Sequence, residues 1–293
     1  MSPDLGRVGM WSGRLQRRPT TEATELAVEW DELGFGALWV PESPAGKDVL
    51  TFATILLGAT RRMVLATGIA NIWVRDPVAM ASARRTIGDA HPDRFVLGVG
   101  VSHRSTAVMR GHEYVKPLET MRSYLAAMID APFDGHPPAA DPPTVVAALG
   151  PKMIAVAGEL ADGIHPFLTS PDHTARARAI LGAGRLVAVE LGAIVTTDAA
   201  SARDAARTNL ARYLQWPNYR NHFLRSGYDE GDLAEGGSNR LIDATYAIGG
   251  AAAIKDRVDE HLAAGADHVA VQIIDGGLDE ADAVRALAPA LMD

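Results

Sequence analysis

The feature that most constrains this chain is a regular alternation of short apolar runs with longer amphipathic runs. Eight apolar runs of strand length follow one another, at residues 7–11, 36–40, 62–71, 94–100, 143–150, 162–168, 185–196 and 268–274. Most of them are apolar throughout, which is typical of parallel strands that are buried on both faces. Strict alternation over eight units predicts a (β/α)8 TIM barrel in preference to a doubly wound sheet.

A doubly wound sheet would also need a phosphate-binding fingerprint after the first strand, and the segment "MWSGRLQRR" does not contain one. The chain has 293 residues. That length is close to the roughly 250 residues of a typical barrel. We therefore expect residues 1–293 to form a single domain.

Helical periodicity and capping residues predict the elements between the strands. Asp48 and Asp76 stand at expected helix N-caps, and Pro77 follows in the first turn, where its missing N–H is not needed. The expected helices cover residues 21–34, 48–60, 76–90, 117–130, 151–161, 171–184, 198–216, 250–264 and a C-terminal stretch that ends at Met292.

Two stretches fall outside this alternation. Residues 131–143 read as a Pro-rich loop, and residues 217–248 form an insertion with aromatic and charged side chains before the last strand. Long insertions in compact domains are often functional. We expect the insertion to be either a lid over the barrel mouth or a subunit contact.

The composition narrows the class of protein. The chain has no cysteine, which excludes disulfides, thiolate metal sites and cysteine nucleophiles and fits a cytoplasmic location. The formal net charge is −8, whereas a nucleic-acid partner needs a basic patch. No apolar run reaches the roughly 18 residues that span a bilayer, and the N-terminal residues lack the apolar core of a signal peptide. We expect neither a nucleic-acid nor a membrane partner.

Functional residues in such a barrel lie at the carboxyl ends of the strands. The residues there do not favour a metal centre, because no two histidines are spaced i, i+4 on an expected helix. The sequence also lacks the G-x-S-x-G elbow of a serine hydrolase. We therefore expect no bound metal and no serine nucleophile.

The segment "AALGPKM" suggests an anion site. It ends a strand at Gly150 and begins a helix with Pro151 in the first turn. The free N–H groups of Lys152 and Met153 would point at the barrel mouth, where the start of a helix favours a phosphate. The alternative is an ordinary tight turn, although phosphate sites in barrels often lie on late βα loops.

The segment "FVLGVGVSH" raises a second hypothesis about ligand binding. Gly98 and Gly100 have the spacing that starts a dinucleotide fingerprint, but His103 stands where the third glycine would be. Alone, the two glycines are compatible with a phosphate cradle, a shelf for a planar ring or a tight turn.

Five motifs taken together resemble one family. In chain order they are "ALWVPES", "LATGIANIW" leading into "DPVAMASA", "DRFVLGVGVSH", "AALGPKMIAVAGELADGI" and "GADHVAVQ". The set resembles the bacterial luciferase-like monooxygenase superfamily, and within it the branch that uses coenzyme F-420, an 8-hydroxy-5-deazaflavin. The resemblance covers nearly the whole chain. It implies a (β/α)8 barrel that holds a flavin-like cofactor at its carboxyl end, commonly in a homodimer.

The resemblance also implies roles for individual residues. A non-proline cis peptide beneath the cofactor ring would lie at Gly68–Ile69, and "GVGVSH" would form a shelf on which Gly98 and Gly100 let the backbone lie against the ring. With the anion turn included, the expected cofactor-binding residues are Gly68, Ile69, Gly98, Gly100, Val101, Ser102, Leu149, Gly150, Pro151, Lys152 and Met153.

The chain departs from the family pattern where the chemistry is expected. Many relatives carry an acid and then a histidine after strand two, and this chain has Glu42 and Ser43. Relatives that oxidise sugar phosphates carry Glu where His103 stands, which argues against such a substrate. Glu42 and His103 are the expected catalytic residues, because a hydride step needs a nearby acid or base. Otherwise Glu42 is a structural carboxylate and His103 a solvent-facing neighbour of the cofactor.

The function expected from the sequence is that of an F-420-dependent oxidoreductase. It would move a hydride between the deazaflavin and a small organic substrate, with the protein supplying binding, orientation and electrostatics. Two alternatives stay open at this stage. One is an FMN-dependent monooxygenase that uses reduced flavin and oxygen, and the other is a flavin- or deazaflavin-binding protein without turnover.

Overall fold

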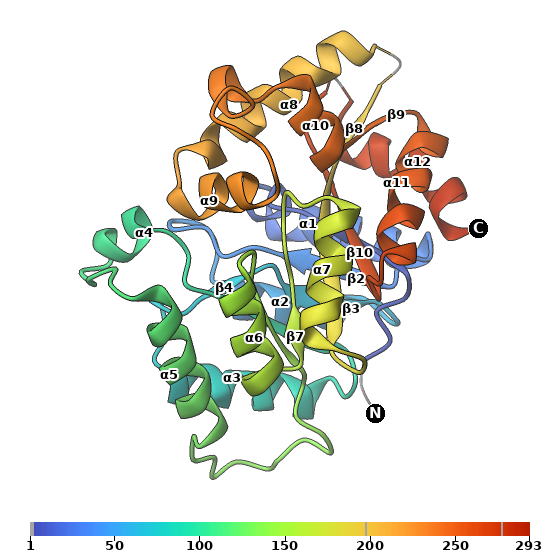
Figure 1. The fold of residues 1–293 in the computed structure, drawn as a ribbon. Helices are drawn as coiled ribbons and strands as arrows, with labels where there is room; N and C mark the ends of the chain where they lie inside the picture. The colour runs from blue at the N-terminus through green and yellow to red at the C-terminus, as the bar shows by residue number, and fades with distance from the viewer. Residues whose placement is uncertain (1–2, 197, 277) are drawn as a thin grey trace.

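The computed structural model describes residues 3–196, 198–276 and 278–293. Its strands pair in parallel around a closed barrel (Figure 1). The strands are β1 (Val8–Trp11), β2 (Ala37–Val40), β3 (Val64–Thr67), β4 (Ala70–Asn71), β5 (Phe95–Gly100), β6 (Thr144–Val146), β7 (Gly163–Ile164), β8 (Leu186–Val195), β9 (Tyr246–Gly249) and β10 (His268–Ile273). The predicted (β/α)8 barrel is confirmed.

Closure of the barrel comes from pairing between β8 and β10. Residues Ala188–Ala193 of β8 lie in register with His268–Ile273 of β10, and β10 continues the sheet to β1. The order β10–β1–β2–β3–β5–β6–β7–β8 then returns to β10. The sheet has no free edge at this seam, as a closed barrel requires.

Strand three, expected as one run over 62–71, is divided into β3 and β4. The peptide bond between them, Gly68–Ile69, is cis, as the family resemblance implied. The two parts pair with different segments of β5, because Leu65 and Ala66 of β3 align with Phe95 and Val96, whereas β4 aligns with Val99 and Gly100. The pairing offset with β5 changes from 30 to 29 residues across the break, so strand three carries one extra residue there.

Two predicted strands are shorter than expected. The run 143–150 contributes only Thr144–Val146 to the sheet, and the run 162–168 contributes only Gly163–Ile164. The residues that follow each strand leave the regular ladder, except that Phe167 forms an isolated parallel bridge with Glu190 of β8. Hydrophobicity alone does not separate residues that pair in the ladder from those that leave it.

Helices surround the barrel and follow the strands in alternation. They are α1 (Thr20–Glu32), α2 (Val49–Ala59), α3 (Pro77–Ala90), α4 (Arg104–Met109), α5 (Pro117–Ile129), α6 (Pro151–Leu160), α7 (Pro171–Leu181), α8 (Ala199–Leu214), α9 (Pro217–Arg225), α10 (Asn239–Thr245), α11 (Ala251–Ala263) and α12 (Glu280–Met292), with short 3₁₀ turns at Leu15–Arg17 and Ala234–Gly236. The expected caps are present: Asp48 accepts from the Thr51 N–H, and Asp76 accepts from the Ala79 N–H.

The insertion before the last barrel strand has structure of its own. It contains α9 and α10, and it ends in β9, which pairs with β8 residues Gly192–Val195. In Figure 1 these orange segments lie beside α8, at one end of the barrel. Phe223 of α9 and Ile242 of α10 share an apolar cluster with Leu210 of α8. Within the described residues, no helix is both long and apolar enough to cross a membrane.

The interior of the barrel is a packed core. The buried Trp39 ring stacks on His165, with ring centroids 4.1 Å apart and planes at 5°. Its Nε1 also lies 3.1 Å from Nε2 of buried His268. Small side chains such as Ala66 and Ala270 occupy the remaining positions of this inner cluster. The ring of Trp39 therefore fills the barrel, and open space begins only at the carboxyl ends of the strands.

Candidate active site

A cleft of about 530 Å³ opens where the barrel strands end. Its wall consists of segments that directly follow β3, β5, β6 and β7, together with one face of α9. The expected residues that line it are Gly68, Ile69, Val101, Ser102, His103, Leu149, Gly150, Lys152 and Met153. Four expected residues do not line it: Glu42, Gly98, Gly100 and Pro151.

One wall of the cleft is the backbone at the cis peptide. Trp11 Nε1 donates to the Gly68 carbonyl over 2.9 Å. A Cβ on Gly68 would lie 2.5 Å from Trp11 Nε1 and 3.1 Å from His165 Nε2, so any larger residue would force these rings apart. Glycine at position 68 therefore lets two polar rings approach the backbone at the cleft.

Gly98 and Gly100 lie beneath the cleft instead of in its lining. A Cβ on Gly98 would be 2.0 Å from the Thr67 carbonyl oxygen, and one on Gly100 would be 2.6 Å from the Ile69 side chain. Both glycines thus allow β5 to pack closely against β3 and β4. Neither glycine lines the cleft, and their expected part in binding the cofactor ring stays a prediction.

His103 connects the end of β5 to the insertion. Its ring stacks on Trp216, with centroids 3.5 Å apart and planes at 14°. Burial lowers the pKa of His103 to about 4, so the imidazole is neutral at pH 7. A neutral imidazole can accept a proton but cannot be a cationic donor at this pH, and a catalytic role of His103 stays a prediction. The position also allows His103 to hold the Trp216 segment against the barrel.

A buried pair of titratable groups faces the cleft from β8 and from the loop after β7. His165 Nε2 lies 3.5 Å from Glu190 Oε2, and both side chains line the cleft. His165 Nδ1 lies 2.9 Å from the Ala188 carbonyl. A carbonyl only accepts, so Nδ1 carries the proton and Nε2 presents a lone pair. Among the described residues, Nε2 has no hydrogen-bond partner.

The protonation of this pair follows from its burial. Burial raises the pKa of the Glu190 carboxyl well above its usual range. Burial also lowers the pKa of His165 to about 4, against the opposing hydrogen bond to Ala188. His165 is therefore neutral at pH 7, and burial favours the protonated form of Glu190 beside it.

The cationic end of the cleft lies at the start of α6. Lys152 and Arg225 both line it, and a Cβ on Gly150 would be 3.4 Å from the Arg225 guanidinium. Gly150 is the N-cap of α6, and Pro151 occupies the first turn. Free N–H groups at a helix start, with two cations beside them, suit an anionic group. Arg225 belongs to α9, so the insertion supplies half of this charge.

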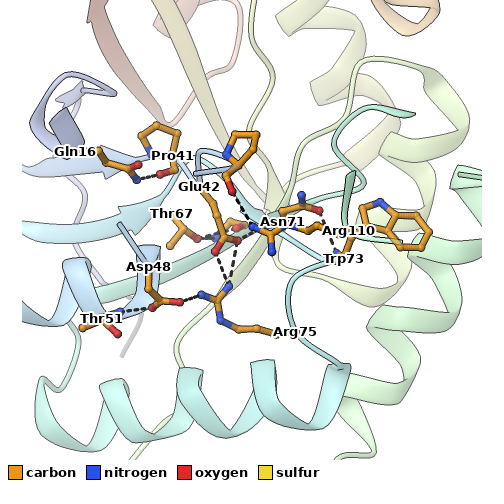
Figure 2. Close-up of polar contacts among 12 residues, drawn as sticks. Gln16, Pro41, Glu42, Asp48, Thr51, Thr67, Asn71, Trp73, Arg75 and Arg110 are labelled. Atoms are coloured by element: carbon orange, nitrogen blue, oxygen red, sulfur yellow. Dashed lines mark hydrogen bonds and ion pairs between the residues drawn. The ribbon is translucent and has the colours of Figure 1, made fainter. Parts of the chain in front are cut away.

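Neighbouring groups bind the Glu42 carboxylate, and Figure 2 shows its contacts with Arg75 and Asn71. Its carboxylate accepts from Arg75 Nη1 at 2.8 Å and from the Asn71 backbone N–H at 2.8 Å. Its side chain is only 5% exposed. Arg75 in turn contacts Asp48, the cap of α2. These bonds give Glu42 a structural role in anchoring β4, and we do not propose that Glu42 transfers a proton.

Several cleft residues were missed by sequence reasoning. Tyr219 and Arg225 lie in the insertion, whose position over the mouth depends on tertiary packing. Glu190 is the single acid within the apolar run "RLVAVELGAIVT", and a lone buried carboxyl of this kind is a recognisable functional signal. No group of three or more metal-ligating side chains occurs among the described residues.

A model of the luciferase-like monooxygenase family matches residues 4–268 of the chain. The chain belongs to this family. Among its curated relatives is a 5,10-methylenetetrahydromethanopterin reductase of Methanolobus tindarius, which is 26% identical over 162 residues. That alignment covers 50% of each protein, so the chain spans about half the length of this relative.

Two solved structures illustrate the similarity of fold. One is described as an F-420-dependent secondary alcohol dehydrogenase in complex with an F-420–acetone adduct, with a TM-score of 0.77, 16% identity and full coverage of both chains. Another is the oxygenating constituent of 3,6-diketocamphane monooxygenase of Pseudomonas putida with FMN, with a TM-score of 0.69, 14% identity and coverage of 96% and 95%. At these identities the likeness concerns the fold, and luciferase-like barrels of this shape accept either cofactor.

Proposed function

We propose that this luciferase-like protein is an F-420-dependent oxidoreductase that moves a hydride between the deazaflavin and a small organic substrate. The observation that carries the proposal is the cleft, which combines a backbone wall at Gly68–Ile69 with a cationic end at Lys152 and Arg225. Its volume falls within the range of about 300–1,000 Å³ for small-molecule sites. The F-420-dependent alcohol dehydrogenase of similar fold supports the same choice.

The residues of the cleft fit such a cofactor. The cis peptide at Gly68–Ile69 and the neighbouring Val101 offer a wall without charged side chains, against which a planar ring can lie. Lys152, Arg225 and the α6 N-terminus offer charge-assisted hydrogen bonds to a phosphate and to carboxylates. Because F-420 carries a phosphate and an acidic lactyl-glutamate tail, this charge favours F-420 over FMN, whose phosphate is its only anionic group.

When bound, the deazaflavin supplies or accepts the hydride. A carbonyl oxygen that becomes an alcohol also gains a proton, and a general acid typically contributes about 10²–10⁴-fold to such a step. Glu190 is the group we assign to this proton, because burial favours its protonated form and it lines the cleft. His165 Nε2, 3.5 Å from Glu190 Oε2, presents a second polar atom beside that carboxyl.

The proposal is tested by titrating the protein separately with F-420 and with FMN while following absorbance and fluorescence. We expect tighter binding of F-420, followed by oxidation of bound reduced F-420 in the presence of ketones, aldehydes or enones. Equal or reversed affinities would contradict the cofactor choice, and oxygen consumption with reduced FMN would favour the monooxygenase. F-420 binding without any turnover would favour a carrier protein.

Two further expectations from the sequence stay predictions. A homodimer is expected from the family resemblance, and analytical ultracentrifugation would test it. A cytoplasmic location is expected from the absence of cysteine, and fractionation of the source cells would test it.

A further inference from the structure

A second cleft, of about 550 Å³, lies at the same end of the barrel. Trp11 and Tyr213 line both clefts and so stand between them. The second cleft is formed by the segment after β1, the end of β10 and one face of α8. Nothing in the proposed cofactor site uses it.

Positive charge dominates the second cleft. Arg14, Arg17 and Arg212 line it, from two separate segments of the chain. Arg14 has only a long ion pair, with Nη2 at 3.9 Å from Asp275 Oδ1. Arg17 and Arg212 form no ion pair within the part of the chain that the structure describes. Two carboxyl groups, Asp275 and Glu280, also line the cleft, and burial raises the pKa of Glu280 to about 7, so the three arginines outweigh the acids. We call this space the arginine cleft.

Uncharged hydrogen-bonding groups complete the lining. The Tyr246 hydroxyl lies 2.8 Å from Asn209 Oδ1 and can donate to it, which leaves the Asn209 amide N–H groups free to donate into the cleft. Guanidinium groups beside amide donors are typical of sites for carboxylates and phosphates, whose oxygens accept several hydrogen bonds at once.

We propose that the arginine cleft binds a carboxylate or phosphate group of the substrate. The assignment to the substrate rests on the proposed function, whereas binding of a small anion does not depend on F-420. The same chemistry could come from the acidic tail of the cofactor. We favour the substrate because Lys152 and Arg225 already form a cationic site for the cofactor tail in the other cleft. Trp11 and Tyr213 line both clefts and stand between them.

The test uses inorganic phosphate as the probe, measured by calorimetry on protein saturated with F-420, so that the cofactor cleft is filled. The double variant Arg17→Ala/Arg212→Ala should bind phosphate at least about tenfold more weakly than the parent, since two charge-assisted contacts are lost. The matched control Arg7→Ala/Arg61→Ala also removes two exposed charges. Arg7 and Arg61 precede β1 and β3, at the opposite end of the barrel, so this control should keep the parent affinity.

Affinity for F-420 separates the two sources of the anion. It should change less than about twofold in the Arg17→Ala/Arg212→Ala variant and fall at least about tenfold in Arg225→Ala. An equal loss of F-420 affinity in both would assign the arginine cleft to the cofactor tail and overturn the proposal. Unchanged phosphate binding in the double variant would overturn it as well.

The proposed function can fail independently of this site. If the protein does not bind F-420, the phosphate titration is carried out on Arg225→Ala, whose cofactor cleft has lost half of its charge. Loss of phosphate binding on adding Arg17→Ala/Arg212→Ala would then support the anion site while the F-420 assignment falls. Retained phosphate binding would refute both.

Discussion

Replacing Glu280 with glutamine should stabilise the protein at neutral pH. Glu280 is 1% exposed, and the Ser12 hydroxyl donates to its carboxyl group over 2.9 Å. Burial raises the pKa of Glu280 to about 7, although the Ser12 hydrogen bond and Arg14 oppose the shift. The carboxyl ionises near pH 4.3 in the unfolded chain. Ionisation therefore favours the unfolded state as the pH rises.

The magnitude follows from the difference between the two pKa values. Below about pH 4.3 the carboxyl is protonated in both the folded and the unfolded state and costs no stability. As the pH rises from about 4.3 to about 7, the unfolded chain ionises first, and the folded state loses stability relative to it. The difference between the two pKa values, about 2.7, corresponds to about 3.7 kcal/mol of unfolding free energy. Glutamine is neutral at every pH and keeps a partner for Ser12. The Glu280→Gln variant should gain about 1 kcal/mol over the parent at pH 5 and about 3.6 kcal/mol at pH 8.

Urea unfolding of both proteins at pH 5, 6.5 and 8 would measure this difference, in buffers without phosphate so that the arginine cleft stays free. Asp275→Asn is the matched control, because it removes one carboxylate from the same cleft at a side chain that is 90% exposed. The difference in unfolding free energy between Asp275→Asn and the parent should not increase with pH in the way expected for Glu280→Gln. A gain for Glu280→Gln that is constant from pH 5 to pH 8, or a loss at pH 8, would refute the reasoning.

Substitutions at four other positions test the candidate site. Gly150→Asp places a carboxylate beside the proposed anion and should weaken F-420 binding at least about tenfold in a fluorescence titration. Unchanged affinity in a folded variant would show that the anion binds elsewhere. Glu190→Gln should keep F-420 affinity but lower turnover by about 10²-fold or more, and parental turnover would remove Glu190 from the proton path. His103→Ala should speed limited proteolysis near Trp216, whereas His103→Phe should restore protection; equal proteolysis in all three proteins would contradict the docking role. Glu42→Gln should cost about 2–4 kcal/mol in urea unfolding, because it breaks a buried ion pair, and F-420 affinity should persist; loss of affinity with parental stability would return Glu42 to the site.

The barrel could be predicted because its signal is repeated along the sequence. Each apolar run is local, and eight repeats determine the architecture even where single boundaries are wrong. The errors fall at the mouth, where the run 143–150 leaves the sheet after Val146 and the run 162–168 leaves it after Ile164. The short strand β9 was missed because its pairing with β8 depends on how the insertion folds back.

The site was only partly predictable because several of its groups meet through tertiary packing. The turn at Gly150 could be found from a strand, a glycine and a helix start in sequence. The proximity of Arg225 to that turn could not, since the two residues come from different units of the fold. The role of Glu42 could not be assigned from the sequence, because a carboxylate at a strand end looks the same in sequence whether its side chain contacts a ligand or an arginine. Here it faces Arg75.

The division of the cofactor cleft between barrel loops and α9 has an evolutionary consequence. The loops after β3, β5 and β6 are attached to strands whose register is fixed by closure of the barrel. Substitutions in these loops are therefore constrained by the whole fold. Helix α9 takes no part in strand pairing and contributes Asn218, Asn221 and Arg225 from its surface. After a gene duplication, selection can therefore change residues such as Asn218 and Asn221 to admit a new molecule, while Arg225 and the barrel loops keep the proposed cofactor site.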